Sequence, residues 1–177
     1  MNLSAQILKE NSRKNWEAVG SFIISNPEKF EELMHLVFHE KGRLARLASQ
    51  VMTNLADDHP ELFTSRHLNA LINLLQKTKD FSIVRNSIRL FQFIDVPEEN
   101  EGRFFELGLK FMKLAESPIA VKAFSMTALR RICEKYPELS AELVPQIEIL
   151  IEEKVSPAIV HRGKEELKIL YKLAGKS

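Results

Sequence analysis

A proline followed directly by glutamate recurs four times in the chain, at residues 27, 60, 97 and 137, with spacings of 33, 37 and 40 residues. Proline suits the first turn of a helix because its missing N–H costs nothing there, and the neighbouring glutamate meets the positive end of the helix dipole. A helix start that returns at nearly constant spacing is typical of a repeat protein. Each repeat is then a unit that buries its apolar face only against its neighbours.

A second recurrence lies further along each repeat, at the start of a later helix. An apolar residue is followed there by a basic residue or histidine, and these pairs are separated by 39, 37 and 39 residues: Ala45-Arg46, Val84-Arg85, Val121-Lys122 and Val160-His161. In the third repeat, Ser117 is expected to cap this helix and Pro118 to occupy its first position. No segment shows the alternation typical of a strand, so each repeat is predicted to be a hairpin of two helices.

Together these recurrences predict an all-α chain that folds as a single α-solenoid domain over residues 1–177. The prediction divides the chain into an N-terminal helical cap at 1–26 and four hairpins at 27–59, 60–96, 97–136 and 137–173. Asn26 is expected to cap the first hairpin, Gly42 to separate its two helices, and Pro145 is a possible break in the last hairpin. The expected helices of the hairpins are 27–40 and 43–56, 65–76 and 81–94, 98–114 and 117–133, and 137–153 and 157–173.

The apolar–basic pair after a short loop, the small or apolar residues on the next turn, and the period near 40 residues resemble HEAT repeats. This resemblance extends over residues 27–173 and implies a right-handed solenoid whose second helices line the concave side, the usual binding surface of such folds. The aspartate that often precedes the second helix of such repeats is present only at Asp80. Gly42, Ser117 and Ser156 occupy the corresponding positions in the other hairpins.

Charge is sorted between the two predicted helix layers, although 25 Lys and Arg nearly balance 24 Asp and Glu in the whole chain. The second helices carry twelve basic and three acidic residues, whereas the first helices and their leading turns carry nine basic and fifteen acidic residues. A basic face on the second helices would suit an acidic segment of a partner protein. The predicted partner-binding side chains are Arg46, Arg85, Arg89, Lys122, Arg130 and Arg162.

Two alternatives use the same residues differently. Arg46, Arg85 and Lys122 come early in their helices and could instead bond to the neighbouring repeat as an internal ladder, an explanation that suits Arg89, Arg130 and Arg131 less well. The basic face could also bind nucleic-acid phosphates. Single-stranded nucleic acid would call for aromatic residues among the basic ones, but Trp16 belongs to the expected cap.

The sequence predicts no enzyme, metal or cofactor, and an active site would need a pocket that is not evident in the sequence. His35 and His39 lie one helical turn apart, but the glutamate that zinc proteases place after the first histidine is missing. The chain also lacks the glycine-rich loops of nucleotide-binding proteins and the Gly-x-Ser-x-Gly of hydrolases.

The remaining features indicate a cytoplasmic protein with no membrane segment. Cys133, the single cysteine, lies on the apolar stripe of its helix and is expected to be a reduced, buried core residue. The first residues meet a charge too soon for a secretory signal, and no apolar run approaches the roughly 20 residues of a membrane span.

Overall fold

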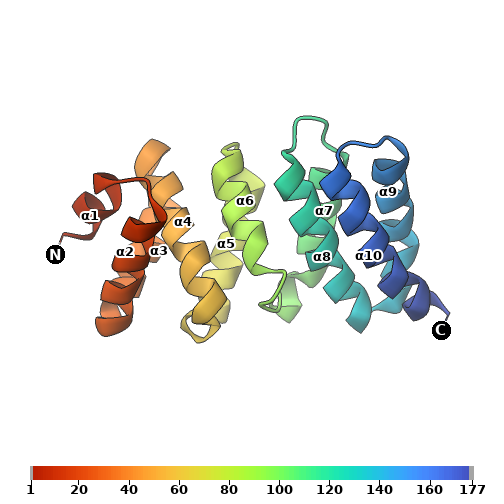
Figure 1. Cartoon of the computed structure of the whole chain (residues 1–177). Helices are drawn as coiled ribbons and strands as arrows, with labels where there is room; N and C mark the ends of the chain where they lie inside the picture. Colours follow the sequence, from red (N-terminus) through yellow and green to blue (C-terminus); the bar gives the residue numbers. More distant parts are fainter. Residues whose placement is uncertain (1, 176–177) are drawn as a thin grey trace. The chain divides into compact units, whose positions relative to one another are not determined.

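All regular structure in the part of the chain that the computed structural model describes, residues 2–175, is helical. The chain divides into two compact units, one ending at Leu90 and the other beginning at Phe91. The first unit contains α1 (Leu3–Lys9), α2 (Arg13–Ser25), α3 (Glu28–His39), α4 (Gly42–Asp58), the 3₁₀ turn η1 (Pro60–Leu62), α5 (Ser65–Lys77) and α6 (Phe81–Leu90). The second unit contains η2 (Glu98–Asn100), α7 (Glu101–Lys113), α8 (Ile119–Lys135), η3 (Pro137–Leu139), α9 (Ser140–Glu152) and α10 (Pro157–Ala174) (Figure 1).

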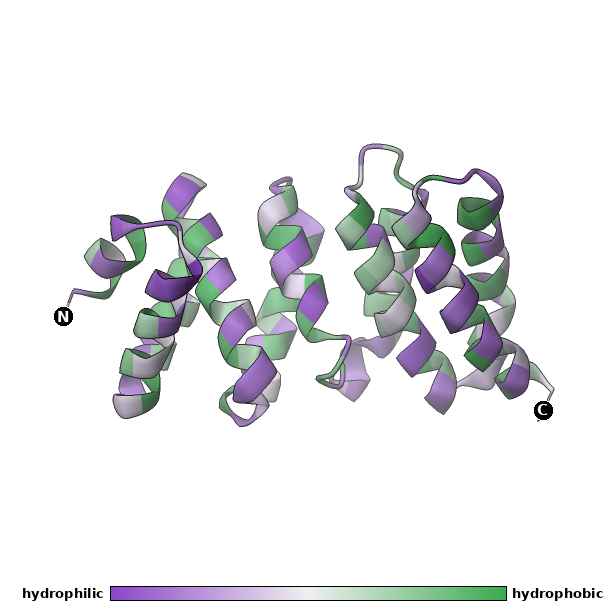
Figure 2. Cartoon of the chain, in the orientation of Figure 1, coloured by the Kyte–Doolittle hydropathy of each residue, from purple (hydrophilic) through white to green (hydrophobic). Residues whose placement is uncertain are grey.

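Helix α4 is the centre of the first unit and packs against α1, α2, α3 and α6. Each of these helices carries hydrophobic and hydrophilic residues, so only part of its surface seeks burial (Figure 2). Leu33 of α3, Met52 of α4 and Leu71 of α5 are among the fully buried side chains of this core. The turn from α3 into α4 uses Gly42 at φ +62°, a conformation that glycine adopts at little cost, as the sequence led us to expect of a break there.

The second unit is built around α8, which packs against α7, α9 and α10. Gly108 of α7 allows a close approach to α8, because a Cβ atom at this position would lie 2.7 Å from Cδ2 of the buried Leu129. Phe91 and Phe104 extend the core, with their ring centroids 4.5 Å apart. The predicted hairpin helices are therefore all present, and Cys133 is buried as expected.

The end of one helix and one expected break differ from the prediction. Helix α6 ends at Leu90 instead of continuing to residue 94, because the chain turns and the carbonyl oxygens of Phe91 and Ile94 accept hydrogen bonds from the Arg131 guanidinium at 3.1 and 3.0 Å. Helix α9 runs unbroken through Pro145, whose exposed position gives its ring room on the outer surface. The hydrogen bonds of a distant arginine, rather than local propensity, thus accompany the end of α6.

Two predicted caps are wrong. The Asn26 side chain does not cap α3 but donates from Nδ2 to the carbonyl oxygen of Phe22 at 2.9 Å, so it closes the end of α2. Pro118, in an extended conformation with ψ 150°, is the residue that precedes α8, and Ser117 lies one position too early to cap it. The Ser117 hydroxyl is buried and makes no hydrogen bond within residues 2–175.

Candidate anion-binding site

The first unit contains a cavity of about 320 Å³ beside the starts of α4 and α6 and the first turn of α2. Three arginines contribute to its wall, and no acidic residue does. The lining residues are Asn11, Trp16, Arg43, Arg46, Leu47, Gln50, Ser82, Arg85 and Asn86. The cavity therefore combines positive charge, polar side chains and one large aromatic ring.

Arg46 forms an ion pair with the loop that leads into α6. Its Nε donates to Oδ2 of Asp80 at 2.6 Å, while Oδ1 of Asp80 accepts from the backbone N–H of Ser82 at 3.0 Å. Burial alone would raise the pKa of the Asp80 carboxyl, but the hydrogen bonds from Arg46 and the backbone outweigh it and lower that pKa. Asp80 thus neutralises Arg46 and stabilises the start of α6.

Arg85 is held in place by neutral groups. Its Nε donates to Oδ1 of Asn86 at 3.2 Å, and Nδ2 of the buried Asn86 donates to the hydroxyl of Ser49 at 2.9 Å. Ser49 in turn donates to the carbonyl oxygen of Arg46 at 2.8 Å. This chain fixes the base of the Arg85 side chain, while its two terminal amino groups have no partner among the described residues.

Arg43 and Trp16 complete the wall. Arg43 is exposed one turn before Arg46, and its side chain makes no hydrogen bond or ion pair with any residue from 2 to 175. Trp16 is half-buried on α2, and its indole N–H is buried without an acceptor in the same range. Trp16 also lines a neighbouring cavity of about 370 Å³ that carries Glu17 and Asp58, so its ring lies between a basic and an acidic pocket.

The arrangement is suited to binding an anion. Two of the three guanidinium groups, those of Arg43 and Arg85, have no carboxylate to balance them within the described chain. Helices α4 and α6 both begin at the cavity, where the positive ends of their dipoles add to the field of the arginines. Guanidinium forks bind carboxylates and phosphates through paired hydrogen bonds.

Of the six predicted partner-binding residues, the structure brings Arg46 and Arg85 into this cavity and gives the other four internal partners. Arg89 donates to the hydroxyl and carbonyl oxygens of Thr53 and pairs with Asp57 at 2.7 Å. Lys122 is buried, and its ammonium donates to the carbonyl oxygen of Met112 at the end of α7 at 3.1 Å. Both side chains therefore stabilise the helix next to their own.

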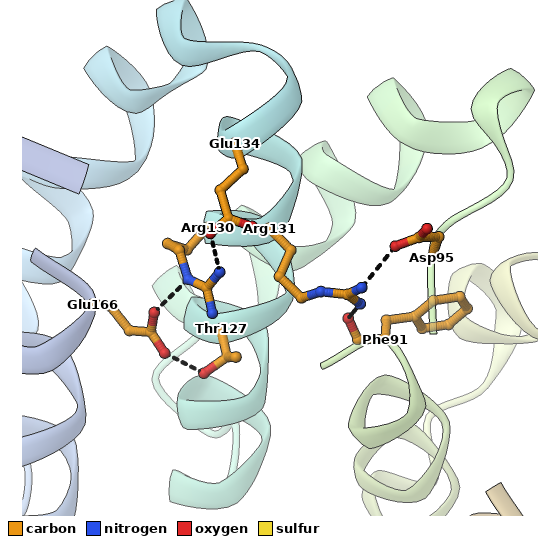
Figure 3. A network of polar contacts seen from close by, with 7 residues as sticks. All are labelled: Phe91, Asp95, Thr127, Arg130, Arg131, Glu134 and Glu166. Carbon is orange, nitrogen blue, oxygen red and sulfur yellow. Dashed lines mark hydrogen bonds and ion pairs between the residues drawn. The ribbon is translucent and has the colours of Figure 1, made fainter. Parts of the chain in front are cut away.

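Arg130 and Arg162 belong to a network between α8 and α10 (Figure 3). Nε of Arg130 donates to Oε2 of the buried Glu166 at 2.8 Å, and the Thr127 hydroxyl donates to the other oxygen of that carboxylate. Nη1 of Arg162 donates to the same Thr127 hydroxyl at 2.7 Å. Arg131 points to the opposite side of α8 and pairs with Asp95 at 2.7 Å (Figure 3).

Arg46 bonds to the next predicted hairpin, as the internal-ladder alternative expected, but Arg85 and Lys122 bond within their own hairpins. Arg89, Arg130 and Arg131, which suited a ladder less well in the sequence, each bond to a neighbouring hairpin. Most ladder partners lie 32 to 39 residues apart, which is about one repeat. The predicted charge difference of the second helices also becomes smaller, because α4 extends to Asp58 and so includes Asp57 and Asp58. The second helices then carry twelve basic and five acidic residues.

The histidines that drew attention in the sequence take other roles. The rings of His35 and His39 lie 4.5 Å apart, but Glu31 turns toward α5, where its carboxylate accepts from Arg66 at 2.6 Å and contacts the buried His67 at 2.9 Å. Across residues 2–175, no three His, Cys, Asp or Glu side chains are grouped to hold a metal ion. Helices of the described chain are also too short or too polar to cross a membrane.

Of the nine residues that line the cavity, the sequence predicted only Arg46 and Arg85, and three of the others matter most for its chemistry. Arg43 was counted in the basic layer but not chosen, although its position three residues before Arg46 predicts a shared helix face. Asn86 gave no signal, because its role depends on Ser49 in another helix. Trp16 was assigned to the cap, and only the packing of α2 on α4 brings it to the arginines.

The paired helices and the polar contacts with a period near one repeat define a helical repeat protein, and its first unit carries a cavity lined by three arginines. A model of the HEAT repeat domain matches residues 3–170, so the chain belongs to the HEAT repeat family, as the sequence resemblance predicted. HEAT repeats generally mediate protein–protein interactions, and proteins of this family are typically non-enzymatic scaffolds. No curated protein and no solved structure matches the chain.

Proposed function

We propose that this protein is a non-catalytic scaffold that binds an acidic segment of a partner protein at the cavity of Arg43, Arg46 and Arg85. The observation that carries this proposal is the wall of three arginines with no acidic residue among its lining. Such an excess of positive charge is stabilised when a negative group enters and replaces the water around the guanidinium forks. Membership of the HEAT repeat family supports a role in protein binding.

The proposal places the main contact at Arg46 and Arg85 and adds Arg43. The other predicted partner-binding residues, Arg89, Lys122, Arg130 and Arg162, serve it indirectly, because their internal bonds hold the second helices in place. The proposal retains the expected right-handed solenoid of four hairpins with its second helices on the concave side. It also includes a cytoplasmic location, for which the single buried cysteine is the supporting feature.

A fluorescein-labelled peptide of six glutamates tests the proposal by fluorescence anisotropy at low salt. Reversing the charge of the two unpaired arginines, in Arg43→Glu/Arg85→Glu, is expected to abolish binding. The control Lys9→Glu/Lys77→Glu makes the same change in net charge on exposed residues of α1 and α5 that do not line the cavity. Equal binding by the wild type and the arginine variant, with equal helicity by circular dichroism, would contradict the proposal.

Single-stranded nucleic acid is the second candidate, and the position of Trp16 beside the arginines favours it. An aromatic ring next to basic groups is the arrangement on which bases stack while phosphates are neutralised. A mobility shift with a twelve-nucleotide strand should then weaken steeply between 50 and 200 mM salt and be lost in Trp16→Ala. The absence of a shift at 50 mM salt would exclude this candidate.

A further inference from the structure

The charges that line the arginine cavity indicate how much negative charge its ligand carries. Asp80 neutralises Arg46 through the 2.6 Å contact, whereas Arg43 and Arg85 have no acidic partner in the described chain. A ligand group that balances the cavity therefore carries about two negative charges. A phosphate monoester carries about 1.5 to 2 negative charges at neutral pH, and a single carboxylate carries one.

We infer that the cavity binds the phosphate group of a phosphorylated side chain in a partner protein. This inference rests on the proposed function, since it names the chemical group in the partner segment that enters the arginine cavity. The phosphate has three terminal oxygens, so it accepts hydrogen bonds from more than one guanidinium fork at once. Arg43 and Arg85 approach the cavity from α4 and α6, which places donors on two sides of an entering group.

The local backbone supports the same group. Helix α4 has 17 residues, and its N-cap residue, Lys41, makes no side-chain hydrogen bond to the free N–H groups of the first turn. Asp80 already satisfies the N–H of Ser82 at the start of α6, so α4 is the helix with donors to offer. Helix starts and arginines together are a common setting for bound phosphate.

The Arg85 fork is fixed before any ligand arrives. Asn86 accepts a partly buried hydrogen bond from Nε of Arg85 and is itself held by a buried hydrogen bond to Ser49, and this leaves the two terminal amino groups of Arg85 for the ligand. A side chain that is already fixed loses less conformational entropy on binding, so the bound state is favoured. Ser49 and Asn86 are therefore positioning residues for Arg85.

Trp16 gives the cavity a wall for the carrier of the phosphate. The cavity of about 320 Å³ is larger than a phosphate group needs, and the half-buried indole forms its apolar side. The carbon atoms of a phosphorylated side chain can pack against this ring while the phosphate reaches the arginines. A free phosphate ion would leave that side of the cavity unused.

A phosphorylated protein fits these observations better than a nucleic-acid strand. A strand presents phosphates in series and calls for a track of available cations, but Arg89, Arg130, Arg131 and Arg162 all donate to groups of the chain itself. The chain as a whole carries a formal charge of only +1. One confined cavity with two unbalanced guanidinium groups suits one doubly charged group.

The test uses three labelled pools of degenerate nine-residue peptides that differ only in the central residue, which is phosphoserine, glutamate or serine. Binding is measured by anisotropy and, independently, by the fluorescence of Trp16, the only tryptophan in the chain. We expect the phosphoserine pool to bind at least tenfold more tightly than the glutamate pool, and the serine pool to show no binding. The affinity of the phosphoserine pool should rise several-fold between pH 5.0 and pH 7.5, because the second pKa of the phosphate is about 6. The affinity of the glutamate pool should stay constant over the same range.

Two variants examine the geometry. Arg43→Ala should weaken the phosphoserine pool about tenfold, and the control Lys77→Ala, which removes the same charge from an exposed position of α5, should not. Arg85→Lys keeps the charge but loses the fork, so it should weaken phosphoserine strongly and glutamate only slightly.

Equal affinity for the glutamate and phosphoserine pools would overturn the inference and leave the proposed function standing. Binding to none of the pools would overturn both. Tighter binding of inorganic phosphate or of a single-stranded oligonucleotide than of the phosphoserine pool would also overturn the inference, because the ligand would then not be a phosphorylated protein.

Discussion

The ion pair between Arg130 of α8 and Glu166 of α10 provides the sharpest test of how this fold is held together. Glu166 is buried, with 6% of its side chain exposed, and Arg130 is 15% exposed. One oxygen of the carboxylate accepts from Arg130 Nε at 2.8 Å and the other accepts from Thr127. Glu166→Ala removes both acceptors and leaves the partly buried guanidinium only its 2.6 Å contact with the half-exposed Glu134 (Figure 3).

The expected cost of Glu166→Ala is about 3–5 kcal/mol in the free energy of unfolding, the range found when one partner of a buried ion pair is removed. Arg130→Ala should cost a similar amount, since it leaves the Glu166 carboxylate buried with a single neutral donor. The double variant should cost less than the sum of the two by about 1–3 kcal/mol, because neither charge is then left without its partner. Urea unfolding followed by circular dichroism measures all three values.

Glu165→Ala is the matched control for this experiment. Glu165 lies next to Glu166 in α10, carries the same charge and pairs with Lys168, but its side chain is 52% exposed. Its removal should leave the free energy of unfolding nearly unchanged, because an exposed ion pair contributes little. If Glu166→Ala cost as little as Glu165→Ala, Arg130 would not depend on Glu166, and the assignment of Arg130 to internal stabilisation would be refuted.

Three further predictions concern other parts of the chain. Burial raises the pKa of the Cys133 thiol to about 11 from an ordinary 9.0, so the reactive thiolate is about a hundredfold scarcer in the folded protein. Ellman's reagent should therefore react slowly with Cys133 until urea is added, and a fast reaction without urea would contradict this. Gly108→Ala should destabilise the protein by about 1 kcal/mol despite the better helix propensity of alanine, because the new Cβ would lie 2.7 Å from a buried leucine. Gly102→Ala in the same helix adds a Cβ in open space and should stabilise the protein, and thermal unfolding compares the two variants. The pKa of Asp80 is lowered in the folded protein, so its contribution to stability is complete above the ordinary value of 3.8 and is lost as the pH falls through the folded value. Asp80→Ala should therefore cost about 1–2 kcal/mol at pH 7, because it removes the helix cap and the ion pair with Arg46. Urea titrations should show this difference shrinking below pH 3.8.

The sequence determined the helices and their pairing to a large extent. Helical spacing of apolar residues and the recurring proline–glutamate pairs located every hairpin helix, because the buried face of a helix requires apolar residues every three or four positions. In the recurring apolar–basic pairs, Ala45 and Val121 are buried as the pattern indicates, but of their basic partners Arg46 is exposed and Lys122 is buried. Helix ends were less determined, as α6 shows, because Arg131 from another helix supplies the hydrogen bonds at its end.

The roles of the basic residues were decided by the tertiary structure. Arg46 and Arg130 look alike in the sequence, each a basic residue on a second helix, yet one lines a cavity and the other is held by a buried glutamate 36 residues away. A hydrogen bond at that separation depends on the distance between two packed helices, which no local pattern encodes. The same holds for Trp16 and Arg43, since only the packing of α2 on α4 joins an aromatic ring to the arginines in one cavity.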